Sequence, residues 1–76
     1  MKNKETITYR EMIQGLREKV TDCRIEIEAL KEEREYVKEQ GKDVREYDEW
    51  IEEQRDEITR LHRLILSLQE VYREVR

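Results

Sequence analysis

The chain has 76 residues, of which 47% are charged and 36% hydrophobic, and it contains no proline and no phenylalanine. This composition, rich in Glu, Lys, Arg and Leu, is typical of long amphipathic helices and coiled coils. It also overlaps with that of disordered chains, but a net charge of only −4 and regularly spaced apolar residues argue against disorder. We expect one domain at most, residues 1–76, whose small core needs a second copy or a partner for comfortable stability.

Charge, cysteine content and hydropathy limit the location and the class of partner. The mildly acidic balance does not favour nucleic acid as a partner. The single cysteine, Cys23, cannot form an internal disulfide and fits a reducing compartment. No apolar run approaches the roughly 18–20 residues of a membrane span, and the first ten residues lack the apolar core of a signal peptide. These features predict a cytoplasmic protein that does not cross a membrane.

Capping signals predict where two helices begin and end. Thr8 with Glu11 forms the pattern of a capping box, and Asp43 with Glu46 repeats it. Gly41 stands just before the second box, at a position where helices often end in the left-handed conformation. We therefore expect helices over about 8–40 and 44–75, joined by a turn over about 41–43.

Apolar residues recur with alternating steps of three and four along both predicted helices, which indicates a coiled coil. In the first helix they are Tyr9, Ile13, Leu16, Val20, Cys23, Ile27, Leu30 and Val37. In the second they are Val44, Tyr47, Ile51, Ile58, Leu61, Ile65, Leu68, Tyr72 and Val75. Only Arg34 and Gln54 put a clearly polar side chain in these rows.

The register of the two rows decides between one continuous helix and a hairpin. A continuous helix that kept the first register would place Asp48, Arg55 and His62 on the apolar side, so it needs a three-residue register jump at Gly41. A reversal between residues 40 and 41 instead pairs positions whose numbers add to 81, such as Leu30 with Ile51. The sequence therefore predicts an all-α, antiparallel two-helix coiled-coil hairpin that dimerises into a four-helix bundle. A jointed rod and a swapped dimer are the alternatives.

A basic stripe follows one edge of the predicted helix pair. Its members are Arg10, Arg17, Arg24, Lys31, Lys38 and, from the second helix, Arg55. One interpretation is that Glu28, Glu35 and Asp48 neutralise the stripe through local ion pairs. The other is that an acidic surface or a nucleic-acid backbone covers it.

The opposite edge carries apolar and small residues that two helices cannot cover. This apolar strip consists of Met12, Gly15, Trp50, Leu64, Ser67 and Val71. A glycine inside a helix costs about 1 kcal/mol relative to alanine, so a close backbone approach at Gly15 would explain it. Lys19 lies on the same edge and can pair with Glu57. The strip is expected to bind a partner or a second copy, while the exposed ring of Trp50 can instead pack on the neighbouring helix.

Templates for catalysis, cofactors and metals are missing. There is a single histidine, Cys23 belongs to the apolar row that forms the seam between the predicted helices, and no glycine-rich phosphate loop occurs. We therefore expect a non-enzymatic protein with no cofactor.

The first functional hypothesis is an interaction module, an adaptor or inhibitor that docks on a larger protein of unknown identity. Acidic helical proteins of this size are often regulators encoded by phages and mobile elements. The predicted architecture is similar to that of the plasmid Rop type, whose hairpins pair into four-helix bundles and bind RNA, although no sequence motif is shared. RNA binding by a dimer is therefore an alternative function. A purely structural, self-associating coiled coil is another.

Overall fold

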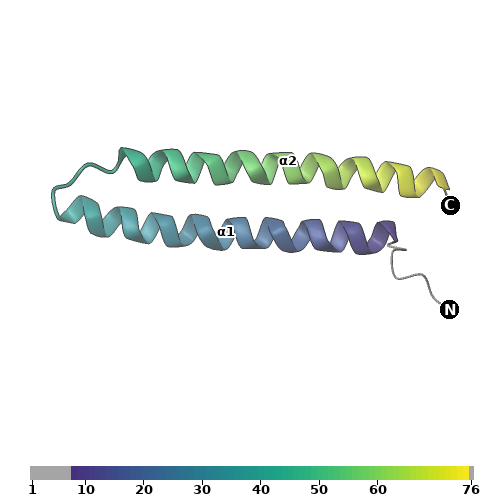
Figure 1. Cartoon of the computed structure of the whole chain (residues 1–76), viewed down its shortest axis with the longest axis horizontal. Helices are drawn as coiled ribbons and strands as arrows, with labels where there is room; N and C mark the ends of the chain where they lie inside the picture. The colour runs from purple at the N-terminus through teal and green to yellow at the C-terminus, as the bar shows by residue number, and fades with distance from the viewer. Residues whose placement is uncertain (1–7, 76) are drawn as a thin grey trace.

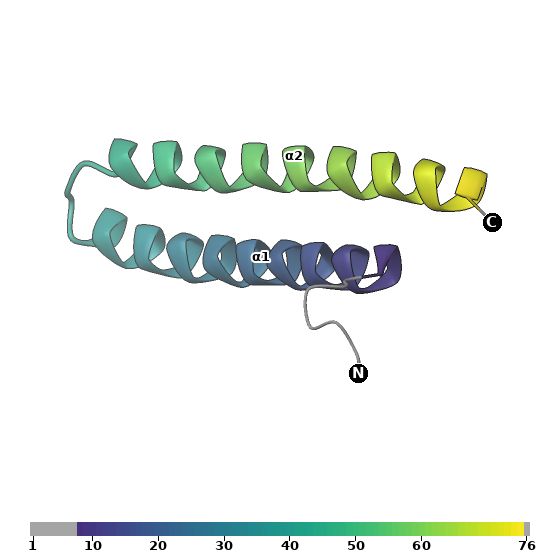
Figure 2. The ribbon, with the colours of Figure 1, turned by 45° about the vertical axis from the view of Figure 1, so that its right-hand side comes forward.

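Two antiparallel α-helices lie side by side and make up most of the chain. The computed structural model describes residues 8–75, with side chains for residues 8–73. Helix α1 spans Tyr9–Glu39 and helix α2 spans Arg45–Val75, and they run in opposite directions along each other (Figures 1 and 2). The predicted helical hairpin is confirmed. We call the end with residues 40–44 the turn end and the other the open end.

Helix α1 begins and ends with the capping motifs that its sequence predicts. The Thr8 hydroxyl accepts from the Glu11 backbone N–H at 3.1 Å, and the Glu11 carboxylate accepts from the Thr8 N–H at 3.0 Å. At the other end, Gly41 has φ +77°, a conformation that costs glycine little because it has no Cβ. The N–H groups of Gly41 and Lys42 donate to the carbonyls of Lys38 and Val37, which completes a Schellman motif. These bonds stop α1 at the turn.

The start of α2 differs from the predicted capping box. The Asp43 carboxylate accepts from the Arg45 N–H at 3.0 Å and pairs with the Arg45 guanidinium at 2.8 Å, rather than serving as the N-cap partner of Glu46. The first helical hydrogen bond runs from the Asp48 N–H to the Val44 carbonyl. Asp43 therefore closes a short turn before the helix, because its side chain reaches the backbone two residues on.

The core is the apolar seam between the helices, and it forms two clusters. Towards the open end, the buried side chains are Ile13, Val20, Leu61 and Ile65, and towards the turn they are Ile27, Leu30 and Ile51. At the open end the rings of Tyr9 and Tyr72 meet edge to face with centroids 6.3 Å apart. These contacts follow the predicted pairing. The side chain of Val75 lies outside the described residues.

An ion pair between the two helices occupies the polar position in the α1 row. The Arg34 Nε donates to an Asp48 carboxylate oxygen at 2.7 Å. The Arg34 side chain thus turns towards α2, and Asp48 is used here and not in neutralising the basic stripe. The pair links the helices near the turn end.

Candidate functional site: a groove at the open end

An apolar groove of about 440 Å³ lies between α1 and α2 near the open end. Its lining residues are Glu11, Met12, Gly15, Leu16, Lys19, Leu64 and Leu68. Leu16 and Leu68 are half-buried and pack against the core cluster, whereas Met12 and Leu64 are 40% and 41% exposed. The groove therefore joins the edge of the core to two large apolar side chains that remain in contact with water.

Open space lies over the α1 backbone where the groove passes Gly15. A Cβ built on Gly15 would meet nothing within 4 Å. The predicted close approach to this glycine is therefore not made by α2. Glycine inside a helix costs about 1 kcal/mol relative to alanine. No contact at Gly15 among the described residues offsets this cost. Among residues 8–73 no side chain uses this space, so any benefit from it has to come from a group outside these described residues.

Two charged side chains, Glu11 and Lys19, flank the apolar part of the groove on α1. One oxygen of Glu11 is held by the Thr8 cap. Lys19 does not form the predicted ion pair with Glu57, because the Glu57 carboxylate is bound by the Arg60 guanidinium at 2.6 Å. Hydrogen bonding from Arg60 lowers the pKa of Glu57, and the positive charges of Arg60 and Lys19 lower it further. The Lys19 ammonium is thus near Glu57 but remains available to another carboxylate.

The structure brings together only some members of the predicted apolar strip. Met12, Gly15 and Leu64 line one groove. Ser67 and the 40% exposed Val71 continue the same edge of α2 towards the open end. Trp50 lies fourteen residues before Leu64, about 21 Å away along the helix.

The Trp50 ring belongs to the turn end. It packs edge to face on Tyr47 of its own helix, with centroids 5.2 Å apart, and stays 42% exposed. Packing of the Trp50 ring on the neighbouring helix, which the sequence suggested, stays a prediction beside this aromatic pair. Trp50 is therefore separate from the open-end groove.

Two of the groove's lining residues, Leu16 and Leu68, are absent from the predicted strip. The spacing of apolar residues predicts that both lie in the seam, and both pack there. Their position at the edge of the seam, beside Met12 and Leu64, is the signal that could have identified them.

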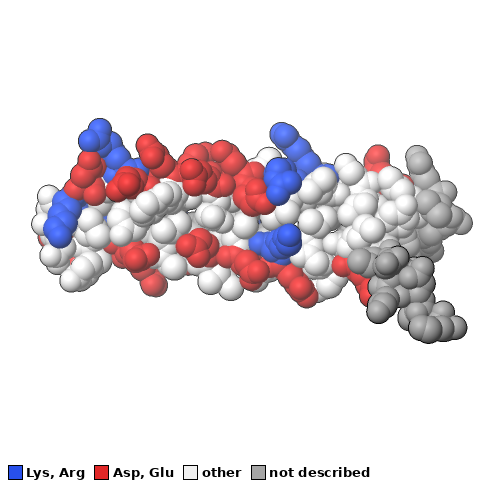
Figure 3. Space-filling view, in the orientation of Figure 1, with Lys and Arg blue, Asp and Glu red and all other residues white. Residues whose placement is uncertain are grey.

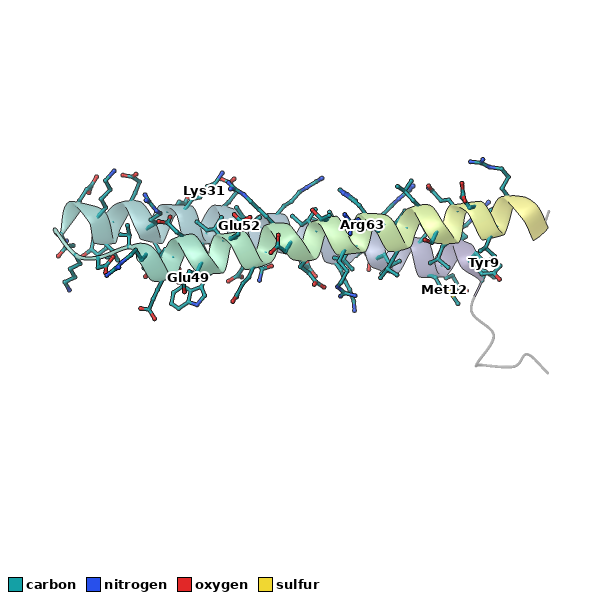
Figure 4. The ribbon with its side chains drawn as sticks, turned by 90° about the horizontal axis from the view of Figure 1, so that it is seen from above. Tyr9, Met12, Lys31, Glu49, Glu52 and Arg63 are labelled. Atoms are coloured by element: carbon teal, nitrogen blue, oxygen red, sulfur yellow. The ribbon has the colours of Figure 1, made fainter. Side chains whose placement is uncertain are left out.

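The basic stripe is divided by local ion pairs. Lys31 pairs with Glu28 at 3.7 Å and Arg55 with Glu52 at 4.0 Å. Near the open end, three arginines form no ion pair with another described side chain and line two hollows together with His62 and Gln69; they are Arg10, Arg17 and Arg24. Figure 4 shows Lys31 of the stripe and Met12 of the groove on opposite sides of the helix pair. The two surfaces are therefore separate.

Charge is distributed unevenly along the hairpin. Residues 28–57, the turn half, carry thirteen acidic and six basic side chains, a net charge of −7. Residues 8–27 and 58–73, the open half, carry five acidic and seven basic side chains, a net charge of +2. In Figure 3, acidic side chains gather over the turn half of both helices, and uncharged surface is widest towards the open end. An acidic partner, or a second copy of the chain, is therefore repelled less by the open half than by the turn half.

Comparison of the chain with protein-family models, curated proteins and solved structures finds no match. Within residues 8–73, no group of three or more His, Cys, Asp and Glu side chains is placed to hold a metal ion. Neither α1 nor α2 has an apolar stretch long enough to span a bilayer. The function therefore has to be argued from the surface of the hairpin itself.

Proposed function

We propose that this hairpin is a non-enzymatic protein-interaction module, an adaptor or inhibitor, whose open-end groove receives an amphipathic helix of a larger protein. The observation that carries the proposal is the combination of an apolar groove with open space over Gly15. A third helix that lies in the groove would cover Met12 and Leu64 and complete a three-helix arrangement. Helices bind in such grooves through apolar side chains on one face, and we expect the same here.

The charged residues at the groove define the partner's chemistry further. Lys19 can pair with an acidic residue at one end of the docked helix, and the free oxygen of Glu11 can accept from a basic residue at the other. Because these two residues are eight positions apart on α1, their partners are about 12 Å apart. The expected ligand is thus a helix with an apolar face and opposite charges about two turns apart.

A charge placed in the groove tests this proposal. Leu64→Glu puts a carboxylate among the apolar groove residues, while Ile25→Glu puts the same group on the outer face of α1, where Ile25 is 63% exposed. Both variants should keep the helical circular dichroism of the parent, because neither residue is in the core. The immobilised parent and Ile25→Glu proteins should retain the same protein from an extract of the source organism, and Leu64→Glu should not.

The affinity of the captured protein, once purified, gives the decisive number. We expect Leu64→Glu to raise its Kd at least tenfold and Ile25→Glu to leave it within twofold. Equal binding by all three proteins would exclude the groove as the docking site. This comparison distinguishes a specific partner from a protein that adheres to any helical surface.

RNA binding by a dimer is the second candidate, and the three unpaired arginines Arg10, Arg17 and Arg24 favour it. It ranks lower because Lys31 and Arg55 of the stripe pair with Glu28 and Glu52, and because the turn half carries a charge of −7. If RNA is the ligand, its affinity falls steeply with salt, and Arg17→Gln reduces that slope. Retention of a protein but no RNA at low salt would reject this candidate. A purely structural coiled coil would bind neither.

A further inference from the structure

We propose that a second copy of the hairpin covers the open-end groove when no partner occupies it, in an offset antiparallel dimer whose two-fold axis passes between Gly15 and Ser67. The inference rests on the groove of the proposed function, although not on the identity of any partner. Docking of a partner helix and self-pairing would then be mutually exclusive. The dimer would hold the groove closed until a partner displaces the second copy.

The small residues at the groove determine where the axis lies. A two-fold axis brings each residue beside it close to the same residue of the other copy. Gly15 has no side chain and nothing within 4 Å of its would-be Cβ, so two α1 backbones can approach there. Tyr9 lies opposite Tyr72 within the hairpin, so Gly15 is level with about residues 66 and 67 of α2. Ser67, exposed and small, is therefore beside the same axis.

This axis pairs the remaining side chains in a complementary way. On α1 it places positions whose numbers add to about 30 opposite each other, so Glu11 faces Lys19 of the second copy and Lys19 faces Glu11. On α2 it places Leu64 opposite Val71 of the second copy, and the reverse. Leu64 and Val71 are 41% and 40% exposed in the single hairpin. One symmetric contact thus supplies two reciprocal ion pairs and covers the exposed apolar side chains of the open end.

The charge distribution disfavours two other symmetric overlaps. A parallel overlap would place one turn half of charge −7 against another. A full-length antiparallel overlap on this face would have its axis near the middle of α1, where Glu26 would meet Glu26 of the second copy. The offset dimer points the two turn halves in opposite directions. It therefore avoids both repulsions and overlaps only the open halves, whose charge is +2.

The size of this overlap predicts a weak dimer. About fifteen residues of each helix overlap, a length of roughly 22 Å across two helices of about 10 Å width each. The covered area is on the order of 400–500 Å² per copy, compared with about 800 Å² for a standard stable interface. A dimer of this size dissociates readily, which allows a partner helix to compete for the groove.

Single-cysteine crosslinking tests the register. In a Cys23→Ala background, Ser67→Cys introduces a thiol of nearly the size of the serine hydroxyl beside the axis. Under mild oxidation this variant should form a disulfide-linked dimer at least ten times faster than Ile25→Cys, whose thiol is on the outer face of α1. The difference should disappear in urea. Equal rates for the two variants in buffer would overturn the proposal, and so would fast crosslinking of Glu26→Cys, which only a full-length overlap predicts.

A second measurement uses the space over Gly15 without any crosslink. Gly15→Leu fits the single hairpin because its Cβ is unobstructed, but its side chain fills the space that the second copy needs. Sedimentation should show a Kd of dimerisation raised at least tenfold for this variant. Gln14→Leu, which adds the same side chain on the opposite edge of α1, should leave it unchanged. A monomeric parent, or equal effects of both substitutions, would refute self-pairing and would not affect the partner-capture comparison of Leu64→Glu.

Discussion

Truncation of Leu61 should be the most destabilising single change in the core. Leu61 is 2% exposed and packs in the open-half cluster with Ile13, Val20 and Ile65. Leu61→Ala removes three carbon atoms from this environment, which costs about 2.4 kcal/mol of transfer free energy at about 0.8 kcal/mol for each. A cavity adds to the cost, and the measured range for buried leucines is about 2–5 kcal/mol.

The thickness of the hairpin places the expected loss in the lower half of that range. Only two helices surround the Leu61 site, so they can close part of the cavity, and we expect a loss of about 2–3 kcal/mol. A domain of this size has a total stability of about 4–11 kcal/mol at roughly 0.05–0.15 kcal/mol per residue. The variant should therefore remain folded at low temperature but with a clearly reduced margin.

Urea unfolding followed by circular dichroism at 222 nm measures this loss. Leu66→Ala is the matched control, because Leu66 lies on the same helix and is 61% exposed. We expect the control to change the free energy of unfolding by less than about 0.5 kcal/mol. A loss below 1 kcal/mol for Leu61→Ala, or equal losses for the two variants, would show that Leu61 is not at the centre of the core.

Three further predictions concern individual residues. Gly15→Ala should raise the free energy of unfolding of the dilute, monomeric hairpin by about 0.5–1 kcal/mol, because alanine is the better helix former and its Cβ has free space. Urea unfolding measures this change, and a loss of stability would contradict the open groove. Hydrogen bonds from Arg45 lower the pKa of Asp43, so the stability that Asp43 contributes is present above its ordinary pKa and is lost as the pH falls through the lowered value. Asp43→Asn should therefore be less stable than the parent near neutral pH, with a difference that shrinks below about pH 4; a difference independent of pH would show that the carboxylate is unpaired. Burial, with the charges of Glu57 and Asp22, raises the pKa of the Cys23 thiol. A thiol reagent should therefore react more slowly with the native chain than with the chain in urea. Equal rates would place Cys23 outside the seam.

The fold was predictable because its determinants are local or periodic. The spacing of apolar residues identifies the seam, and the restart of that spacing after Gly41 favours a reversal over a continuous helix. The left-handed φ of Gly41 and the Thr8 capping box follow from short-range chemistry that the sequence states directly. The periodicity and the capping residues were therefore enough to predict the seam, the turn and the ends of α1.

The side-chain partners were less predictable, because several solutions satisfied the same pattern. Asp48 was expected to neutralise the basic stripe, yet it reaches Arg34 on the other helix. Asp43 met the consensus of a capping box, yet its own neighbour Arg45 competes for the carboxylate. These choices depend on rotamers and distances within a few ångströms, which heptad positions do not specify.

The candidate site was predicted in part for a similar reason. The sequence identified Met12, Gly15 and Leu64 as neighbours on an edge that two helices cannot cover, and these three residues line one groove. It also grouped Trp50 with them, since that residue shares their edge. Heptad position gives the side of a helix but not the distance along it, and the aromatic contact of Trp50 with Tyr47 lies at the turn end.

The measurement that tests the account most directly is a disulfide between the two helices of one chain. Leu30 and Ile51 are buried in the same core cluster, so cysteines at both positions in a Cys23→Ala background should be close enough to oxidise. The hairpin predicts that the disulfide forms within single chains at every protein concentration, with the mass of a monomer on a non-reducing gel. If only linked pairs of chains form at every dilution, α1 and α2 of one chain do not pack together, and neither the groove nor the dimer proposed for it exists.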